Sequence, residues 1–380
     1  MPLLPKPYPD EIIGSVICRA IRHNGLNLYA QIRAIYGAPS SEFSFLMSVR
    51  PKDFGRLAGL DAEELVLQHT MLPYSTAFMP TKLKVKYLSN ALCQQVNPMS
   101  DIVRPLTRGV VFRRICPECI KKEIVQFGET YWHRSHLLPG VLKCTEHEVA
   151  LERTIIPLQG TANLLHTSLP NEIPGYRLGV QVKAQLHDSV TTYSLQALNC
   201  DVDSNVNWYE VSRDRVVKAG YVLQPGRVAS KLLEMAVSRA FGQAYLVDMG
   251  CEVRPPDSWP AMIVRSNSDA TFATPKHVLF QSFLDTIGAM ADLNLLDSYR
   301  KRGPKFKDRS VEDKILAGRA SLVIHEAEVE QRRLAVKELF ARADYAVFSH
   351  HRAKYPLTNA IVNKLKSSQL FQRRLGESQR

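Results

Sequence analysis

The chain has 380 residues, a length that predicts about two or three domains rather than one. Its 45% hydrophobic and 23% charged residues are ordinary for a soluble globular protein and exclude a mainly disordered or fibrous chain. No apolar run is long enough for a membrane span, and the first residues lack the apolar stretch of a secretory signal, so we expect a cytoplasmic protein.

The positive charge is concentrated toward the C-terminus. The 49 Lys and Arg residues outnumber 37 Asp and Glu residues, which gives a net charge of +12. Residues 298–380 hold 19 of the basic and 9 of the acidic residues, a surplus of +10. Such an asymmetry favours a polyanionic partner, either nucleic acid or an anionic membrane surface. The alternative is a solvated helical face that aids solubility.

The N-terminal part of the chain has the apolar periodicity of short helices. Gly25 and Gly37 follow the first two of these helices, and Asp61 stands at the start of the third as its expected N-cap. The pattern predicts helices over residues 11–23, over 28–36, from 61 onward, and over 81–96. These helices fit either a helix-turn-helix DNA reader or a plain helical packing unit, and the packing unit is the favoured interpretation.

Beyond these helices, β-like and helical patterns alternate. A segment with metal-ligand spacing runs over 111–151, and residues 155–207 hold several short β-like runs, such as 176–182. Helical periodicity resumes at Trp208. The segments that follow are predicted as a helical stretch over 228–246, a loop over 254–257, an apolar helix over 276–296, a basic linker over 299–307 and a charged helix over 312–343.

Four potential metal ligands occur as two closely spaced pairs. Cys116 and Cys119 form a C-x-x-C pair, and Cys144 and His147 form a C-x-x-H pair, with 24 residues between them. Each pair can lie on one tight turn and face one ion. Thiolates and an imidazole favour Zn²⁺, and a shell of four protein ligands predicts one structural zinc. The remaining cysteines are expected to be small buried apolar residues: Cys18, Cys93, Cys200 and Cys251.

Two further histidines, His133 and His136, lie between the ligand pairs. Either could replace one of the four ligands, or the segment could hold a catalytic metal. In the favoured interpretation they do not bind the metal but form hydrogen bonds that order the loop around it. A zinc deaminase is excluded, because Ile115 precedes the first cysteine where that motif has proline, and no H-x-E motif lies upstream.

Several uncommon residues of the metal segment occur in a recognisable order. They stand in the stretches RICPEC at 114–119, GETYWHRSH at 128–136, LPGV at 138–141 and CTEH at 144–147, with PYPDE at 7–11 as an opening. Together these stretches closely resemble the signature of the TniQ family, over residues 5–155. A looser similarity to the longer TnsD branch of this family covers residues 208–290 and includes the stretch PKHVLF at 275–280.

The resemblance implies a target-site selector of a bacterial cut-and-paste transposon. Such a protein binds double-stranded DNA at an attachment site and recruits an AAA+ ATPase regulator, which then brings the transposase. The resemblance implies no membrane partner, and a nucleoid-associated place in the bacterial cytoplasm when the protein is bound. Consistent with a protein that is not an enzyme, the sequence holds no P-loop and no nucleophile elbow.

Two other functions stay open at this point. The chain could be an adaptor that links an RNA-guided CRISPR effector complex to the AAA+ regulator, without sequence-specific DNA binding of its own. It could also be a metal-dependent nuclease that uses His133 and His136, which is the least favoured option because the closed zinc site already accounts for the motif.

The fold class expected is mainly α with a small zinc-binding α+β segment. A helical N-terminal region and a zinc knuckle form the predicted TniQ-like domain over 1–155. A TnsD-like middle region is predicted over 156–297, and a basic helical C-terminal region over 298–380.

Two basic clusters are candidate contact surfaces. The first could follow phosphates or enter a minor groove, or it could be a solvated linker. It consists of Arg300, Lys301, Arg302, Lys305, Lys307 and Arg309. The second lies beside the predicted zinc knuckle and could face DNA or an acidic surface of the regulator. It consists of Arg113, Arg114, Lys121 and Lys122.

Overall fold

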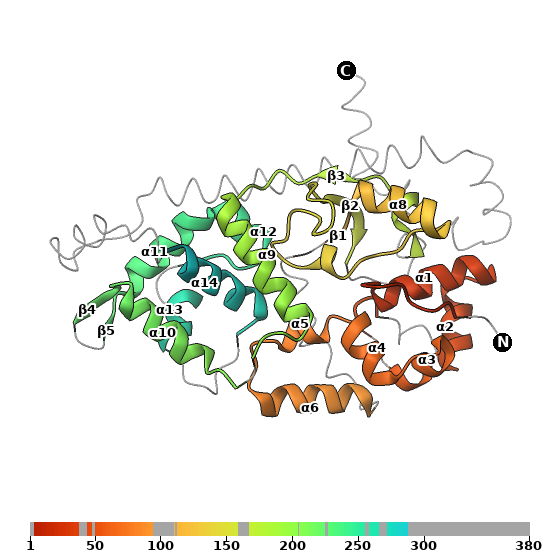
Figure 1. Ribbon diagram of the computed structural model, residues 1–380, viewed down its shortest axis with the longest axis horizontal. Coiled ribbons are helices and arrows are strands. Elements are labelled where there is room, and N and C mark those ends of the chain that lie inside the picture. Colours follow the sequence, from red (N-terminus) through yellow and green to blue (C-terminus); the bar gives the residue numbers. More distant parts are fainter. Residues whose placement is uncertain are drawn as a thin grey trace, which may run out of the picture. The chain divides into compact units, whose positions relative to one another are not determined.

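The fold is described by a computed structural model of the chain (Figure 1). The residues described are 4–37, 44–47, 50–93, 110, 112–158, 167–203, 205–224, 227–254, 258–265 and 272–287. Contacts divide the chain into two units, Met1–Ala327 and Glu328–Arg380, and all described residues lie in the first. No helix in this described part combines the length and the apolar character that crossing a membrane requires.

The N-terminal part is helical, as predicted. The helices are α1 (Ile13–Asn24), α2 (Leu28–Tyr36), α3 (Pro51–Ala58), α4 (Ala62–His69), α5 (Leu72–Thr76) and α6 (Thr81–Leu92). Helix α1 ends at Gly25, whose φ of 61° is a left-handed conformation that glycine adopts at no steric cost. The expected N-cap is confirmed, because the Asp61 carboxylate accepts hydrogen bonds from the amides of Glu63 and Glu64.

One apolar cluster joins helices α1 to α4. Val16 and Ile17 of α1 pack in it with Ile32 of α2, Phe54 of α3 and Leu65 of α4, and all of these side chains are buried. A narrow contact orients α1 at its start. A Cβ added to Gly14 would lie 2.2 Å from a carbon of the Phe45 ring, so the close approach there requires glycine.

A small antiparallel sheet follows in the order β1-β2-β3. Its strands are β1 (Phe112–Ile115), β2 (Glu152–Pro157) and β3 (Tyr176–Arg177). Helix α8 (Pro117–Phe127) follows β1 directly, and the short 3-10 helices η2 (Ser135–Leu137) and η4 (Pro170–Glu172) lie in the connections. The predicted mixture of helix and strand in the metal segment is confirmed (Figure 1).

The middle region is more helical than we predicted. Among the described residues of 155–207, strand is limited to the end of β2 and the two residues of β3, and the longest element is helix α9 (Ala184–Leu198). The other elements are α10 (Trp208–Lys218), β4 (Val222–Gln224), β5 (Arg227–Val228), α11 (Ser230–Phe241), α12 (Gln243–Asp248), α13 (Trp259–Arg265) and α14 (Thr274–Ile287). The β4–β5 hairpin interrupts the helical pattern expected after Trp208.

Helix α14 is the centre of the middle region, where it contacts α5, α9, α10, α11 and α13. His277 of α14 is fully buried in an aromatic cage. Its ring stacks on Phe78 at a centroid distance of 4.9 Å, and Tyr209 and Phe272 approach it edge-on at 5.4 and 6.3 Å. Neither ring nitrogen has a hydrogen-bond partner among the described residues. Burial, with a smaller contribution from the charge of Lys276, lowers the pKa of His277 to about 3.

Buried polar contacts join the sheet to the middle region. Asp248 of α12 pairs with Arg114 of β1 and Arg153 of β2, at 3.5 and 2.9 Å between the nitrogen and oxygen atoms. The Tyr245 hydroxyl donates to the carbonyl oxygen of Gly140 at 2.7 Å. The boundary that we expect between residues 155 and 156 falls inside β2. Residues on either side of this position therefore belong to one packed unit.

Candidate metal centre

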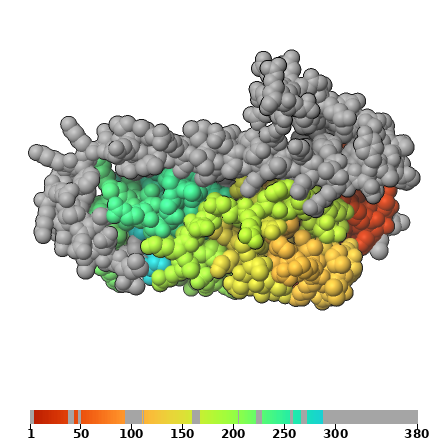
Figure 2. All heavy atoms as spheres, turned by 90° about the horizontal axis from the view of Figure 1, so that it is seen from above, coloured from red at the N-terminus to blue at the C-terminus, as the bar shows by residue number. Residues whose placement is uncertain are grey.

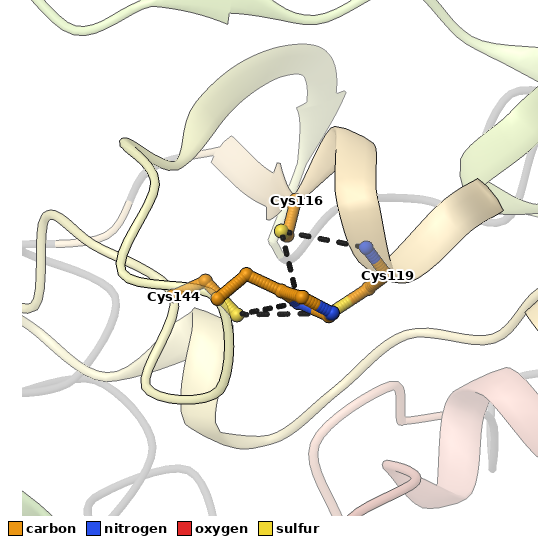
Figure 3. A group of neighbouring side chains, drawn as sticks. Cys116, Cys119 and Cys144 are labelled. Carbon is orange, nitrogen blue, oxygen red and sulfur yellow. Dashed lines mark hydrogen bonds between the residues drawn. The ribbon is translucent and has the colours of Figure 1, made fainter. Parts of the chain in front are cut away.

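The junction between β1 and α8 places the first pair of thiols. Cys116 is the N-cap of α8, and its sulfur accepts a hydrogen bond from the amide of Cys119 at 3.5 Å. Pro117 stands at the first helical position, where its fixed φ suits a helix start and its missing amide hydrogen is not needed. The C-x-x-C pair therefore spans the first turn of a helix, and both sulfurs lie on the same side (Figure 3).

A tight loop places the second pair. The amide of Glu148 donates to the carbonyl of Cys144 at 2.9 Å, and the amide of Cys144 donates to the carbonyl of Val149 at 2.8 Å. Glu148 takes a left-handed φ of 55° at this turn. The loop brings Cys144 toward the start of α8, where its sulfur lies 3.6 Å from that of Cys119 (Figure 3).

The four predicted ligands converge. The Nδ1 atom of His147 lies 3.7 Å from the sulfur of Cys116, 3.3 Å from that of Cys119 and 3.6 Å from that of Cys144. All four ligand atoms lie within 4.8 Å of one another. Around a tetrahedral zinc ion, the usual bond lengths place two sulfurs about 3.8 Å apart and a sulfur and a nitrogen about 3.6 Å apart. The cluster thus has dimensions that can hold a metal ion.

The three thiols also depend on one another electrostatically. Hydrogen bonds with Cys116 and Cys144 raise the pKa of Cys119, and hydrogen bonds with Cys116 and Cys119 lower the pKa of Cys144. One thiolate can therefore form here with protonated neighbours as donors, whereas three thiolates side by side would repel one another. A cation between them would offset this repulsion and stabilise all three as thiolates.

His133 and His136 lie beside the cluster. The Nε2 atom of His133 is 2.6 Å from the carboxylate of Glu123, and the other ring nitrogen is 3.7 Å from that of Asp10. Burial alone would lower the pKa of His133, but hydrogen bonds and charges of Asp10 and Glu123 raise it to about 9. His136 is buried, with Nε2 at 3.9 Å from the sulfur of Cys119. These positions fit groups that order the loop.

The sequence pattern did not predict the two partners of His133, which are Glu123 and Asp10. Glu123 is buried on the inner side of α8, and the amide of Tyr131 donates to it at 3.1 Å. Donor atoms of Cys119, Glu123 and His133 lie within 4.8 Å of one another, which makes them a second group of potential ligand atoms next to the first. The spacing of four residues between Cys119 and Glu123, one helical turn, was the available signal.

The other missed feature is the segment that precedes α1. The carbonyl of Asp10 accepts from the amide of Arg134 at 2.8 Å, and the amide of Ile12 donates to the carbonyl of Trp132 at 3.0 Å. The Asp10 carboxylate also accepts from the hydroxyl of Ser135 at 2.6 Å. The opening of the chain is therefore bound directly to the loop that carries the two histidines.

An ion-pair network fixes the same segment to α1. Arg19 lies between Glu11 and Glu129, with nitrogen–oxygen distances of 2.7 and 2.8 Å, and its guanidinium stands over the ring of Tyr8 at 3.8 Å. Glu129 also pairs with His23 at 2.9 Å. The residues that the resemblance singled out at 7–11 and at 129 are thus in mutual contact.

The basic cluster expected beside the metal segment is only half exposed. Arg113 is fully buried and packs over the rings of Phe45 and Trp132, and Arg114 is buried at the ion pair with Asp248. The expectation that both arginines face a partner is therefore wrong. Their side chains point into the core because they lie in a strand that is buried on both faces.

Lys121 and Lys122 do reach the surface. Both lie on α8, whose residues appear in orange on the face shown in Figure 2. Lys121 pairs with Glu118 at 2.7 Å, and Lys122 pairs with Glu146. Each charge is therefore balanced locally, which weakens this surface as a site for a polyanion. The first basic cluster, from Arg300 to Arg309, lies outside the described residues.

The lone cysteines divide into two kinds. Cys18 and Cys251 are buried, as predicted. Cys93 and Cys200 are exposed, so the expectation that they belong to the core is wrong. Cys93 follows the last residue of α6, and Cys200 follows α9, and helix ends of this kind lie at the surface.

The family comparison decides how the N-terminal part is assigned. Residues 2–151 match the family model described as TniQ, and this span includes the Cys/His cluster, its histidine loop and the segment bound to that loop. The TniQ match covers less than half of the 380 residues. The recognition made from the sequence motifs is therefore confirmed, and within this TniQ region the signature residues are those that build and surround the cluster.

One curated protein with sequence similarity is the transposon Tn7 transposition protein TnsD of Escherichia coli. The two sequences are 22% identical over 156 residues, which cover 38% of this chain and 30% of TnsD. The match thus spans less than a third of the length of TnsD. In addition to the TniQ match, it supports the looser similarity to TnsD.

Proposed function

We propose that the chain selects target sites in DNA transposition. In this proposal it binds double-stranded DNA at an attachment site and recruits an AAA+ regulator ATPase, which in turn brings the transposase. The observation that carries the proposal is the match of residues 2–151 to the TniQ family, together with the similarity to a transposition protein.

We further propose that Cys116, Cys119, Cys144 and His147 hold one Zn²⁺. Four of the six distances between the ligand atoms, from 3.3 to 3.7 Å, and the limit of 4.8 Å on all six support this ion. Four protein ligands leave no coordination position for water, so the ion would stabilise the fold rather than activate a substrate. This role favours a targeting protein over a metal-dependent nuclease.

The DNA contacts proposed outside the described residues are Arg300, Lys301, Arg302, Lys305, Lys307 and Arg309. The surplus of positive charge in residues 298–380 supports them. Phosphate contacts of this kind would position the protein on DNA without specifying a sequence. The choice of site would then depend on base contacts made elsewhere, or on a partner.

The test is a selection from genomic DNA. The purified full chain is mixed with fragmented bacterial DNA at near-physiological salt, and the retained fragments are sequenced. One strongly enriched site supports direct target selection. Weak retention that disappears with added salt contradicts it and supports the adaptor to a CRISPR effector complex. Cleavage of plasmid in the presence of Mg²⁺ or Zn²⁺ would instead support the nuclease.

A further inference from the structure

Helix α6 has a face that no described element covers. It packs against α3, α4 and α5 and forms the outer edge of this group in Figure 1. Ala91 is its one buried residue. The outward stripe is Lys82, Val85, Lys86 and Ser89, all exposed, and the Val85 side chain is 61% exposed. These positions repeat at the helical interval of three or four residues, so they share one side of the helix.

The charge of this stripe is unbalanced. No Asp or Glu occurs in the sequence between Glu64 and Asp101, so α6 contains lysines and no acid. Among the described residues, neither Lys82 nor Lys86 has a carboxylate within ion-pair distance, including Glu63 and Glu64 of the neighbouring α4. The two exposed lysines of α8 differ in this respect, because each pairs with a glutamate.

The third lysine of the helix indicates which side faces inward. Lys84 is half-buried, and this burial lowers its pKa. Electrostatic interactions with Cys200 and Asp203, which act in the opposite direction, offset only part of the decrease. Lys84 therefore lies toward the chain that follows α9, whereas Lys82 and Lys86 project from the opposite side. The exposed pair is four residues apart, which is about 6 Å along the helix axis.

Lys82 does not stabilise the helix in which it lies. The first turn of a helix has a partial positive charge, which favours acidic residues and disfavours a cation such as Lys82. An anion placed there would interact favourably with both the lysines and the helix dipole. The charge pattern of α6 is thus complementary to a polyanion.

We propose that the exposed face of α6, formed by Lys82, Val85, Lys86 and Ser89, contacts the phosphate backbone of duplex DNA. This inference rests on the proposed function, in which the chain binds target DNA. It assigns part of the binding to the TniQ region itself, in addition to the basic residues near the C-terminus. The lysines neutralise phosphates, and the serine hydroxyl can donate a hydrogen bond to a phosphate oxygen.

The experiment measures affinity for a random-sequence duplex as a function of salt, using the full chain. The variant Lys82→Gln/Lys86→Gln removes two charges from α6 and keeps residues that favour helix. Each lost phosphate contact lowers the slope of log affinity against log salt by about 0.9, so we expect a slope shallower by about 2 and an affinity at least about tenfold weaker at 0.1 M salt.

Two controls separate the possible outcomes. Lys121→Gln/Lys122→Gln removes the same charge from α8, and Lys82→Arg/Lys86→Arg keeps the charge on α6. The inference requires the slope to stay unchanged in both. Three results would overturn the inference. The first is an equal decrease of the salt slope in the α8 variant, and the second is an unchanged slope in the α6 glutamine variant. The third is that the wild type binds anionic lipid vesicles more strongly than it binds duplex DNA. Absence of duplex binding by the wild type contradicts the direct-binding function as well.

Discussion

Cys116 has two roles that one substitution can separate. It caps α8 and also contributes a sulfur to the Cys/His cluster. Serine is a good N-cap, because its hydroxyl accepts the hydrogen bond that the sulfur accepts here, but it is a poor ligand for zinc. A Cys116→Ser variant should therefore keep the helix cap and lose the metal.

We expect the wild type to bind about one zinc per chain and the Cys116→Ser variant to bind almost none. Metal binding is coupled to folding, so the variant should also unfold at a lower denaturant concentration. Elemental analysis and chemical unfolding measure the two effects. Cys200→Ser, at an exposed cysteine, is the control and should change neither. Full zinc content in Cys116→Ser would contradict the ligand set.

His277 predicts a dependence of stability on pH. Its pKa is about 3 in the folded chain and near 6.5, the ordinary value of histidine, when the chain is unfolded. The unfolded state therefore binds a proton more readily, and the neutral ring stabilises the fold fully only above about pH 6.5. As the pH falls below that value, the free energy of unfolding should decrease by up to about 1.4 kcal/mol per pH unit from this residue.

A His277→Phe variant should reduce this decrease, because phenylalanine can occupy the aromatic cage and does not titrate. Urea unfolding of both proteins at about pH 7 and about pH 5 measures the difference. The change in the free energy of unfolding between the two pH values should be smaller in the variant than in the wild type. An equal difference in both proteins would mean that other groups, such as the buried carboxylates, determine the pH dependence.

At the scale of elements, Asp248 links α12 to two strands. Its carboxylate is almost completely buried and pairs with Arg114 and Arg153. An Asp248→Ala variant would leave these two guanidinium groups near each other without their shared anion. Removing one partner of a buried pair costs about 3 to 5 kcal/mol, so we expect a loss of that size in the free energy of unfolding.

The matched control is Arg254→Gln, which removes an exposed ion pair with Glu252. Surface pairs contribute about 1 kcal/mol or less, so this variant should stay close to the wild type. Equilibrium unfolding in urea compares the three proteins. Similar small effects of both substitutions would mean that the sheet and α12 do not depend on the carboxylate of Asp248.

The elements that the sequence predicted well have strong local signals. Helices α1 and α2 end at glycines, and α4 begins at an aspartate cap, so their positions follow from residues within one turn. Helix α9 has no such signal at its start, where Lys183 makes no side-chain cap. It contains Val190 and adjacent threonines, which favour strands, and becomes helical through packing of its apolar side on α14.

The candidate site was predictable in its ligands but not in its surroundings. Closely spaced ligand pairs are visible in a sequence because each pair lies on one turn. The contacts of Asp10 with Ser135 and of Arg19 with Glu129 join residues more than a hundred positions apart. The burial of Arg114 likewise depends on Asp248, far along the chain. No local pattern predicts such pairings.

At the scale of the whole molecule, removal of the metal should act over a limited region. A chelator would leave three adjacent thiols without their cation and loosen the turn of α8 and the Cys144 loop. We expect amide hydrogen exchange to increase at Cys119, Cys144 and, through the shared loop, at Ile12 and Arg134. The amides of α14 should stay protected, because their packing involves none of the ligands. Uniform exchange across all helices would contradict this.

The binding of residues 10–12 to the histidine loop has a consequence for synthesis on the ribosome. The hydrogen bond between Ser135 and Asp10 spans 125 residues of sequence. Asp10 is made before the histidine loop and therefore lacks its partner in that loop until Ser135 has emerged, and contacts with such separation form slowly. A fragment that contains only the metal segment would have every ligand but would lack the hydrogen bonds from residues 10–12. The metal centre should thus mature late in translation, even though its ligands are close in sequence.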